Sequence, residues 1–190
     1  MFKYLKLSII GGLSGGIFSL LSYVASLLLT NRPLYVDFLL GGLFFTVVGI
    51  GIASSLVTAI PKLAEKKKKM LYGGIVAGFL AGMFFNFGIG LYIGIIIYPI
   101  VVGLVVKLLH IPAISLRISL GGILGGIIGS IISAIFYLFW LFLQKVYPIF
   151  HDQLLIMSVV ISTAIITYCM NLGLLIFAGN LCNNLKNGKG

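Results

Sequence analysis

A run of forty residues, 70–109, contains a single charged residue, Lys107. A helix needs about 20 consecutive apolar residues to cross the hydrocarbon core of a bilayer, so this run is long enough for two crossings. The whole chain has the same character, because 61% of its 190 residues are hydrophobic and 8% are charged, whereas soluble domains have about 25% charged residues. The sequence therefore predicts an all-α, polytopic integral membrane protein.

Turn-forming and charged segments divide the chain into six apolar stretches. Two of the dividers contain Pro61 and Pro148, and proline ends helices and favours turns. The first apolar run is too long for a cleaved signal peptide, so we expect it to be retained. The expected spans are about 7–29, 36–60, 70–86, 90–109, 118–143 and 154–181, within one transmembrane domain over residues 1–182, followed by a polar C-terminal tail over residues 183–190.

Basic residues collect on one side of this topology. Six spans place both termini on the same side as the loops at residues 61–70 and 107–117, and that side holds eleven of the 13 Lys and Arg residues, leaving only Arg32 and Lys145 opposite. Because cytoplasmic loops are enriched in Lys and Arg, we expect a multi-pass protein of the cell membrane with both termini in the cytoplasm. The same topology accounts for the excess of positive charge, so we expect no nucleic-acid partner.

A glycine-rich block recurs three times, over residues 11–16, 73–78 and 121–126, each time with the pattern Gly-Gly-x-x-small-Gly and a preceding basic residue. In lipid, small residues four apart allow two helices to approach closely and gain dispersion contacts. The repeat predicts three Gly-rich helical hairpins that pack like a glycine zipper through Gly12, Gly16, Gly74, Gly78, Gly122 and Gly126. The alternative is that glycine is simply frequent in membrane helices.

The apolar spans carry little that could perform chemistry. No Asp, Glu, Lys, Arg or His lies deep in any expected span, although proton relays and ion-coupled pumps use such groups. His110 and His151 fall on opposite sides of the membrane, so they cannot act together. Cys169 and Cys182 lie about 20 Å apart on one helix, too far for a disulfide. We therefore expect no enzyme activity, no metal and no cofactor.

The third expected span is short. Residues 70–85 form a helix of about 24 Å, against about 30 Å for the hydrocarbon core, so the turn from Asn86 to Gly90 would lie below the membrane surface. Non-helical backbone at that depth is tolerated where it lines a cavity. Asn86, Tyr168 and Asn171 are also polar residues within spans that an interfacial belt of Tyr and Trp does not readily explain. Together these observations predict a substrate-binding site that includes Asn86, Tyr92, Tyr168 and Asn171. The alternative is a tilted helix or a locally thinner bilayer.

The charged segment between the second and third spans contains four consecutive lysines, Lys66, Lys67, Lys68 and Lys69. Basic residues next to a span attract anionic lipid headgroups, with about 1 kcal/mol for each residue near the surface. We expect these lysines to bind headgroups. The alternative is that they form a solvated loop that only sets the topology.

Two classes of function fit these features. The first is a small membrane transport component, a substrate-binding subunit that needs partner subunits because the chain has no ATPase motif and no ion-coupling charge. In size, six spans, cytoplasmic termini and a glycine-rich first helix, the chain is broadly similar to the substrate-capture subunits of energy-coupling-factor transporters. The resemblance is one of layout and carries over no binding residue. The second class is a non-catalytic structural or assembly subunit of a larger membrane complex. Both classes have the lipid bilayer and other membrane subunits as partners.

Overall fold

The computed structural model describes residues 2–28, 33–85, 90–109 and 112–186. Of these residues 96% are helical and none forms a strand, which confirms the predicted all-α class. Four helical segments in the described chain are long and apolar enough to cross a membrane, and they are Phe2–Ala25, Val36–Ala59, Ile114–Val146 and Asp152–Gly179. The protein is therefore built from helices that suit a membrane interior.

Helix boundaries fall close to the dividers in the sequence. The elements are α1 (Phe2–Leu28), α2 (Leu34–Ala59), α3 (Pro61–Ala64), α4 (Lys67–Phe85), α5 (Gly90–Leu108), α6 (Pro112–Val146), the short 3-10 helix η1 (Pro148–Phe150) and α7 (His151–Lys186). Pro61 is the first residue of α3, a position where the missing N–H costs no helical hydrogen bond. Three of the four lysines belong to the first turn of α4 rather than to a loop, and α7 continues past residue 182.

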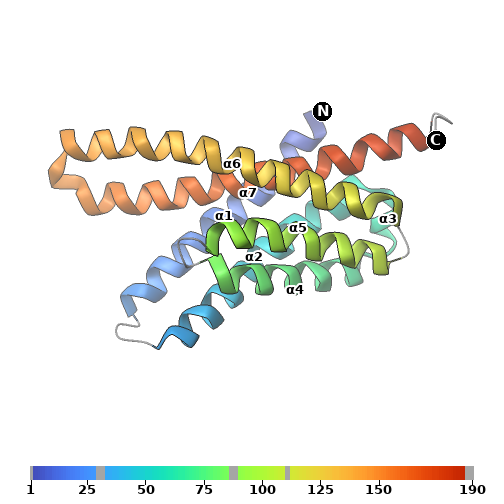
Figure 1. The fold of residues 1–190 in the computed structure, drawn as a ribbon, viewed down its shortest axis with the longest axis horizontal. Helices are drawn as coiled ribbons and strands as arrows, with labels where there is room; N and C mark the ends of the chain where they lie inside the picture. Colours follow the sequence, from blue (N-terminus) through green and yellow to red (C-terminus); the bar gives the residue numbers. More distant parts are fainter. Residues whose placement is uncertain (1, 29–32, 86–89, 110–111, 187–190) are drawn as a thin grey trace.

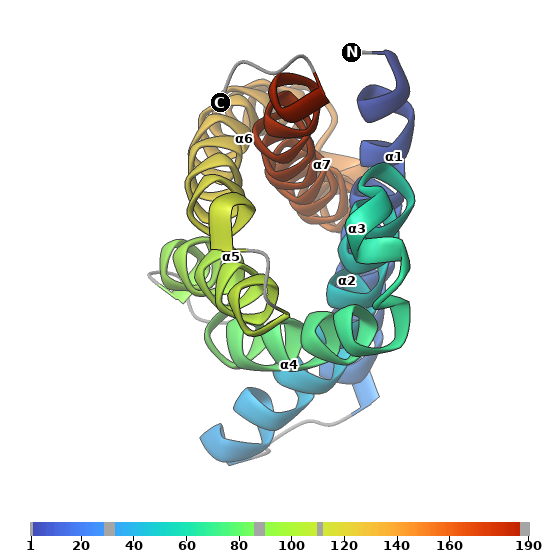
Figure 2. The same ribbon diagram turned by 90° about the vertical axis from the view of Figure 1, so that its right-hand side faces the viewer.

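The long helices of the described chain form a closed ring in the order α1, α2, α4, α5, α6 and α7, and α7 packs back against α1 (Figure 2). The most extensive contacts are those of α6 with α7, α2 with α4, and α1 with α7. Only the first of these pairs joins the two helices of an expected hairpin. The arrangement as three Gly-rich hairpins is therefore not confirmed, because two of the three most extensive contacts join helices of different hairpins.

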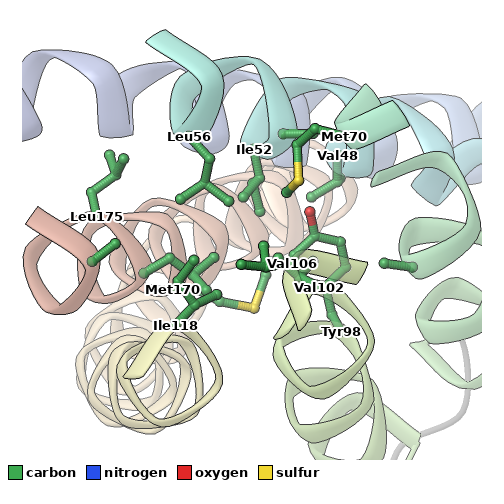
Figure 3. Packing of buried hydrophobic residues seen from close by; sticks show 14 of the residues in the cluster. Val48, Ile52, Leu56, Met70, Tyr98, Val102, Val106, Ile118, Met170 and Leu175 are labelled. Carbon is green, nitrogen blue, oxygen red and sulfur yellow. The ribbon is translucent and has the colours of Figure 1, made fainter. Parts of the chain in front are cut away.

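A hydrophobic core fills the ring at the end that carries α3. Most of its side chains come from the second halves of α2, α5 and α7, from α3 and from the beginnings of α4 and α6, which lie at this end because neighbouring helices run in opposite directions. Phe18, Phe45, Ala81 and Ile95 extend the same core toward the opposite end. Among the core residues, Figure 3 labels Val48, Ile52, Leu56, Met70, Tyr98, Val102, Val106, Ile118, Met170 and Leu175. The core therefore closes the ring at the end of the basic residues.

The opposite end of the bundle is more open in its helix arrangement. The α1–α2 pair and the α6–α7 pair diverge there, whereas α4 and α5 end earlier (Figure 1). The difference follows from helix length, because α4 has 19 residues and α6 has 35, or about 28 Å against 52 Å at 1.5 Å per residue. The outer surface of α6 is apolar here, with Ile135 64% and Leu138 66% exposed. Such a surface suits contact with lipid.

Candidate functional site

Helix α4 contacts α2 through backbone atoms. A Cβ atom added to Gly74 would lie 2.5 Å from the carbonyl oxygen of Gly49, and one added to Gly78 would lie 2.6 Å from that of Phe45. On the adjacent face of α4, a Cβ on Gly73 would overlap Val105 of α5. Because a carbonyl cannot rotate away as a side chain can, any residue larger than glycine at Gly74 would separate the two helices.

Helix α6 uses its glycines in the same way. A Cβ on Gly121 would lie 2.5 Å from the carbonyl oxygen of Gly173 in α7, and one on Gly122 would lie 2.6 Å from Pro99 in α5. Successive residues of an α-helix differ in direction by about 100°, so a glycine doublet presents a small residue to two neighbours. In both α4 and α6, the first glycine of the doublet faces the following helix of the ring and the second faces the preceding one.

The glycine block of α1 packs differently. Both of its first glycines face α7, because a Cβ on Gly11 would lie 2.8 Å from Asn171 and one on Gly12 would lie 3.3 Å from the carbonyl oxygen of Ala164. A Cβ on Gly16 would meet its nearest neighbour, Val160, at 3.8 Å, which is an ordinary van der Waals distance. Similar sequences in the three blocks therefore do not correspond to equivalent contacts in all three helices.

Of the four expected substrate-binding residues, the structure describes the side chains of Tyr168 and Asn171. Asn86 lies outside the described residues, and Tyr92 is part of α5, although its side chain is not among those described. Tyr168 lies against α1, where its Cβ is 3.3 Å from the position of a Cβ on Gly12. Asn171 lies in the interior where α7 meets α1 and α2, whereas α5 packs against α4 and α6. The expected site as a whole therefore stays a prediction, and the two described members both lie where α7 packs against other helices.

Asn171 connects three helices. Its side chain is fully buried, and its Oδ1 atom accepts a hydrogen bond of 2.8 Å from the hydroxyl of Ser55 in α2. Its Nδ2 atom donates a hydrogen bond of 3.3 Å to the carbonyl oxygen of Leu7 in α1. Buried polar groups are normally paired, because an unpaired one loses its bonds to water without replacement. The observed role of Asn171 is therefore to join α1, α2 and α7.

Two aromatic residues make similar interhelical bonds that their sequence context did not reveal. The hydroxyl of Tyr98 in α5 is fully buried, points toward α2 (Figure 3) and donates a long hydrogen bond of 3.4 Å to the carbonyl oxygen of Gly49. The indole N–H of Trp140 in α6 donates to the carbonyl oxygen of Leu154 in α7. Tyr and Trp in spans usually mark the membrane interface, so their type alone does not predict these contacts.

Two buried side-chain atoms of the described chain have no hydrogen-bond partner, the Oγ of Ser22 and the Nε2 of Gln144. Ser22 lies in the second half of α1 and Gln144 in the last turn of α6. These helix ends belong to the end of the bundle where the helix pairs diverge (Figure 1). Gln144 is 8% exposed and lines a groove of about 490 Å³ on the surface of α6 with Leu138, Leu141, Phe142 and Lys145. Each of these two atoms is thus buried without a hydrogen bond to replace its bonds to water.

The buried polar residues of the described chain are all Ser, Thr, Asn or Gln. Among the described residues, no group of three or more His, Cys, Asp and Glu side chains could hold a metal ion. No protein-family model matches this chain, and neither a curated protein nor a solved structure matches it. The fold and the site therefore define a membrane-type helical bundle with an uncharged interior.

Proposed function

We propose that this protein is a small membrane transport component that binds its substrate at the diverging end of the ring and works with partner subunits. The position of Ser22 and Gln144 carries the proposal, because both unpartnered buried atoms lie at that end. Ligand sites combine apolar walls with a few polar groups that fix the orientation of the ligand. The opposite end is filled by the hydrophobic core, which would separate the site from the other side of the membrane.

The chemistry of the interior favours an uncharged substrate. A charged substrate would need a buried partner of opposite charge to offset the loss of its hydration, and the buried polar residues of the described chain are neutral. Lys145 also lines the groove beside Gln144, but it is exposed. In this proposal the protein is not an enzyme, and its energy source is a partner subunit. The broad similarity in layout to the substrate-capture subunits of energy-coupling-factor transporters is consistent with this division of roles.

The proposed topology has six spans in the cell membrane, with α4 and α5 crossing beside the four longer helices. The packing of α4 between α2 and α5 supports this, because α4 is part of the same ring as the longer helices. The excess of Lys and Arg at the end that carries α3 supports a cytoplasmic position for that end. The diverging end would then face the outside of the cell.

This orientation predicts the result of labelling single cysteines with a membrane-impermeant maleimide on intact cells. In a background without Cys169 and Cys182, Ile149→Cys in η1 should react from outside, whereas Lys67→Cys at the start of α4 should react only after the cells are opened. Both native residues are exposed, and Ile149 is 87% exposed, so accessibility does not favour either site. Reaction of Lys67→Cys in intact cells, with Ile149→Cys protected, would reverse the orientation.

A structural or assembly subunit is the second candidate. The observation that favours it is the use of Asn171 in helix packing, since the buried polar residue expected to bind a substrate is already bonded to Ser55 and Leu7. The exposed apolar surface of α6 would then contact other subunits instead of lipid.

Thermal unfolding in detergent, measured with a panel of uncharged vitamins and metabolites, separates the two candidates. A ligand stabilises by RT ln(1 + [L]/Kd), or about 2.7 kcal/mol at a hundredfold excess over Kd. We expect one compound class to stabilise the protein, and Gln144→Leu to abolish this effect. Ser130→Ala is the matched control, because the Ser130 hydroxyl bonds only the Gly126 carbonyl of its own helix among the bonds described. A stable multi-subunit complex by native mass, with no response to any compound, would instead identify an assembly subunit.

A further inference from the structure

A groove of about 360 Å³ lies on the outside of the ring, between α2 and α4. Ile50 of α2 and Leu71 and Ile75 of α4 form its apolar part, and Lys68 and Tyr72 form its polar part. The four α4 residues are spaced at i, i+3, i+4 and i+7, so they lie along one face of that helix. Ile50 and Ile75 directly follow Gly49 and Gly74 in sequence. The groove therefore follows the outer side of the close contact between these two glycines.

Along α4, the lining residues change from charged to amphipathic to apolar. A membrane surface changes in the same order, from headgroups through the interface to acyl chains. Lys68 is exposed in the first turn, the amphipathic Tyr72 follows and is 69% exposed, and Ile75 lies one turn deeper toward the apolar part of the helix. A lysine binds phosphate as a cation, a tyrosine hydroxyl can donate to a phosphate oxygen, and the isoleucines match an acyl chain. The volume falls within the range of about 300–1,000 Å³ that is typical of ligand sites.

We propose that this groove, defined by Ile50, Lys68, Leu71, Tyr72 and Ile75, is a binding site for one anionic phospholipid of the leaflet at the lysine-rich side. The phosphate lies between the Lys68 ammonium and the Tyr72 hydroxyl, and the first part of one acyl chain lies over Ile50 and Ile75. The inference requires only that the chain is embedded in a membrane, and it is independent of the proposed transport function.

The structure assigns different roles to neighbouring lysines. The Lys66 side chain is half-buried and donates a hydrogen bond to the carbonyl oxygen of Leu109, directly after the end of α5. A cation at a helix C-terminus also interacts favourably with the helix dipole, so Lys66 serves to hold α5 against the α3–α4 turn. Lys67 and Lys69 are exposed and do not line the groove. Of the four lysines expected to bind headgroups, only Lys68 belongs to the site.

The role of Lys68 in lipid binding can be tested by native mass spectrometry. The detergent-solubilised protein is titrated with phosphatidylglycerol, and binding of the first lipid is measured. Lys68→Gln should weaken binding of the first lipid about fivefold, which corresponds to the roughly 1 kcal/mol attributed to one basic residue near anionic headgroups. Lys67→Gln and Lys69→Gln are matched controls, because each removes the same charge from the same helical turn. They should change binding by less than twofold. The difference between wild type and Lys68→Gln should decrease at high salt.

A second pair of variants tests the apolar part of the groove. Ile75→Trp should fill it and reduce lipid binding, whereas Val76→Trp places the same side chain on a neighbouring face that is 52% exposed and outside the groove. Equal weakening by all three lysine variants would show diffuse attraction and would overturn the proposal. The proposal would also be overturned if phosphatidylcholine bound with equal affinity, or if free glycerol phosphate competed at the same concentration as lipid. It would likewise be overturned if Lys68→Gln lost a bound protein subunit instead of lipid.

Discussion

Alanine at Gly74 or Gly121 is expected to lower the free energy of unfolding by about 1–3 kcal/mol, the usual cost of overpacking a tight core. The added Cβ would lie 2.5 Å from a carbonyl oxygen of the neighbouring helix in both cases, Gly49 for Gly74 and Gly173 for Gly121. The helices must separate, and no hydrophobic effect in lipid compensates for the lost contacts. Reversible unfolding in mixed micelles or steric trapping in bicelles would measure the change.

The matched control is Gly16→Ala, the same substitution within another of the three glycine blocks. Its Cβ would have ordinary contacts at 3.8 Å, and alanine is the better helix former by up to about 1 kcal/mol, so stability should be unchanged or higher. Gly126→Ala should give a smaller loss than Gly74→Ala, because its Cβ would meet only the Ile95 side chain, which can rotate. Equal effects at Gly16 and Gly74 would contradict the contacts described and would leave the glycine repeat as a matter of composition.

Replacement of Asn171 by Leu is expected to destabilise the protein by about 1–2 kcal/mol. The change removes the bonds to Ser55 and Leu7 and leaves the Leu7 carbonyl with one bonding partner fewer. Interhelical hydrogen bonds in membrane proteins contribute about 0.6 kcal/mol on average and up to about 1.7 kcal/mol. The contribution of the Ser55–Asn171 pair is best measured by a double-mutant cycle with Ser55→Ala.

The double-mutant cycle measures the coupling free energy between Ser55 and Asn171. If the two side chains bond across the helices, the double variant should be less destabilised than the sum of the single variants by about 0.5–1.5 kcal/mol. Ser55 also lies 2.7 Å from the carbonyl oxygen of Ile52 in its own helix, so Ser55→Ala alone should have a small effect. Strict additivity would show that Asn171 acts through its shape against Gly11 rather than through its bond to Ser55.

The expected substrate site shows the limit of predicting a residue's role from its type alone. Tyr168 and Asn171 were selected because they are polar residues in an apolar span, which is where binding groups occur. The same types also form bonds between helices, and Asn171 is used in that way. The difference lies in whether a partner is within reach, and the partner of Asn171 is 116 residues away along the chain. Ser22 and Gln144 are distinguished by the lack of such a partner in the described structure.

Local features of the sequence determined the helical class, the membrane character and most helix ends. The length and apolarity of a run decide whether it suits a bilayer, whatever its neighbours are, and Pro61 begins a new helix because proline cannot continue the previous one. The end of the third span at Phe85 was also evident, but α4 begins at Lys67, so its 19 residues make a helix of about 28 Å rather than the expected 24 Å. These properties depend on residues within a few turns of one another.

Only the tertiary structure decided which helices are neighbours and which face of each helix is turned inward. A soluble helix reveals its inner face by the alternation of apolar and polar residues, but these helices are apolar on all sides, so periodicity does not mark that face. The glycine doublets indicated close packing without identifying the neighbour, and α2 proved to pack more extensively against α4 than against α1. In lipid the close fit of particular backbones determines the neighbours, and that fit exists only in the assembled ring.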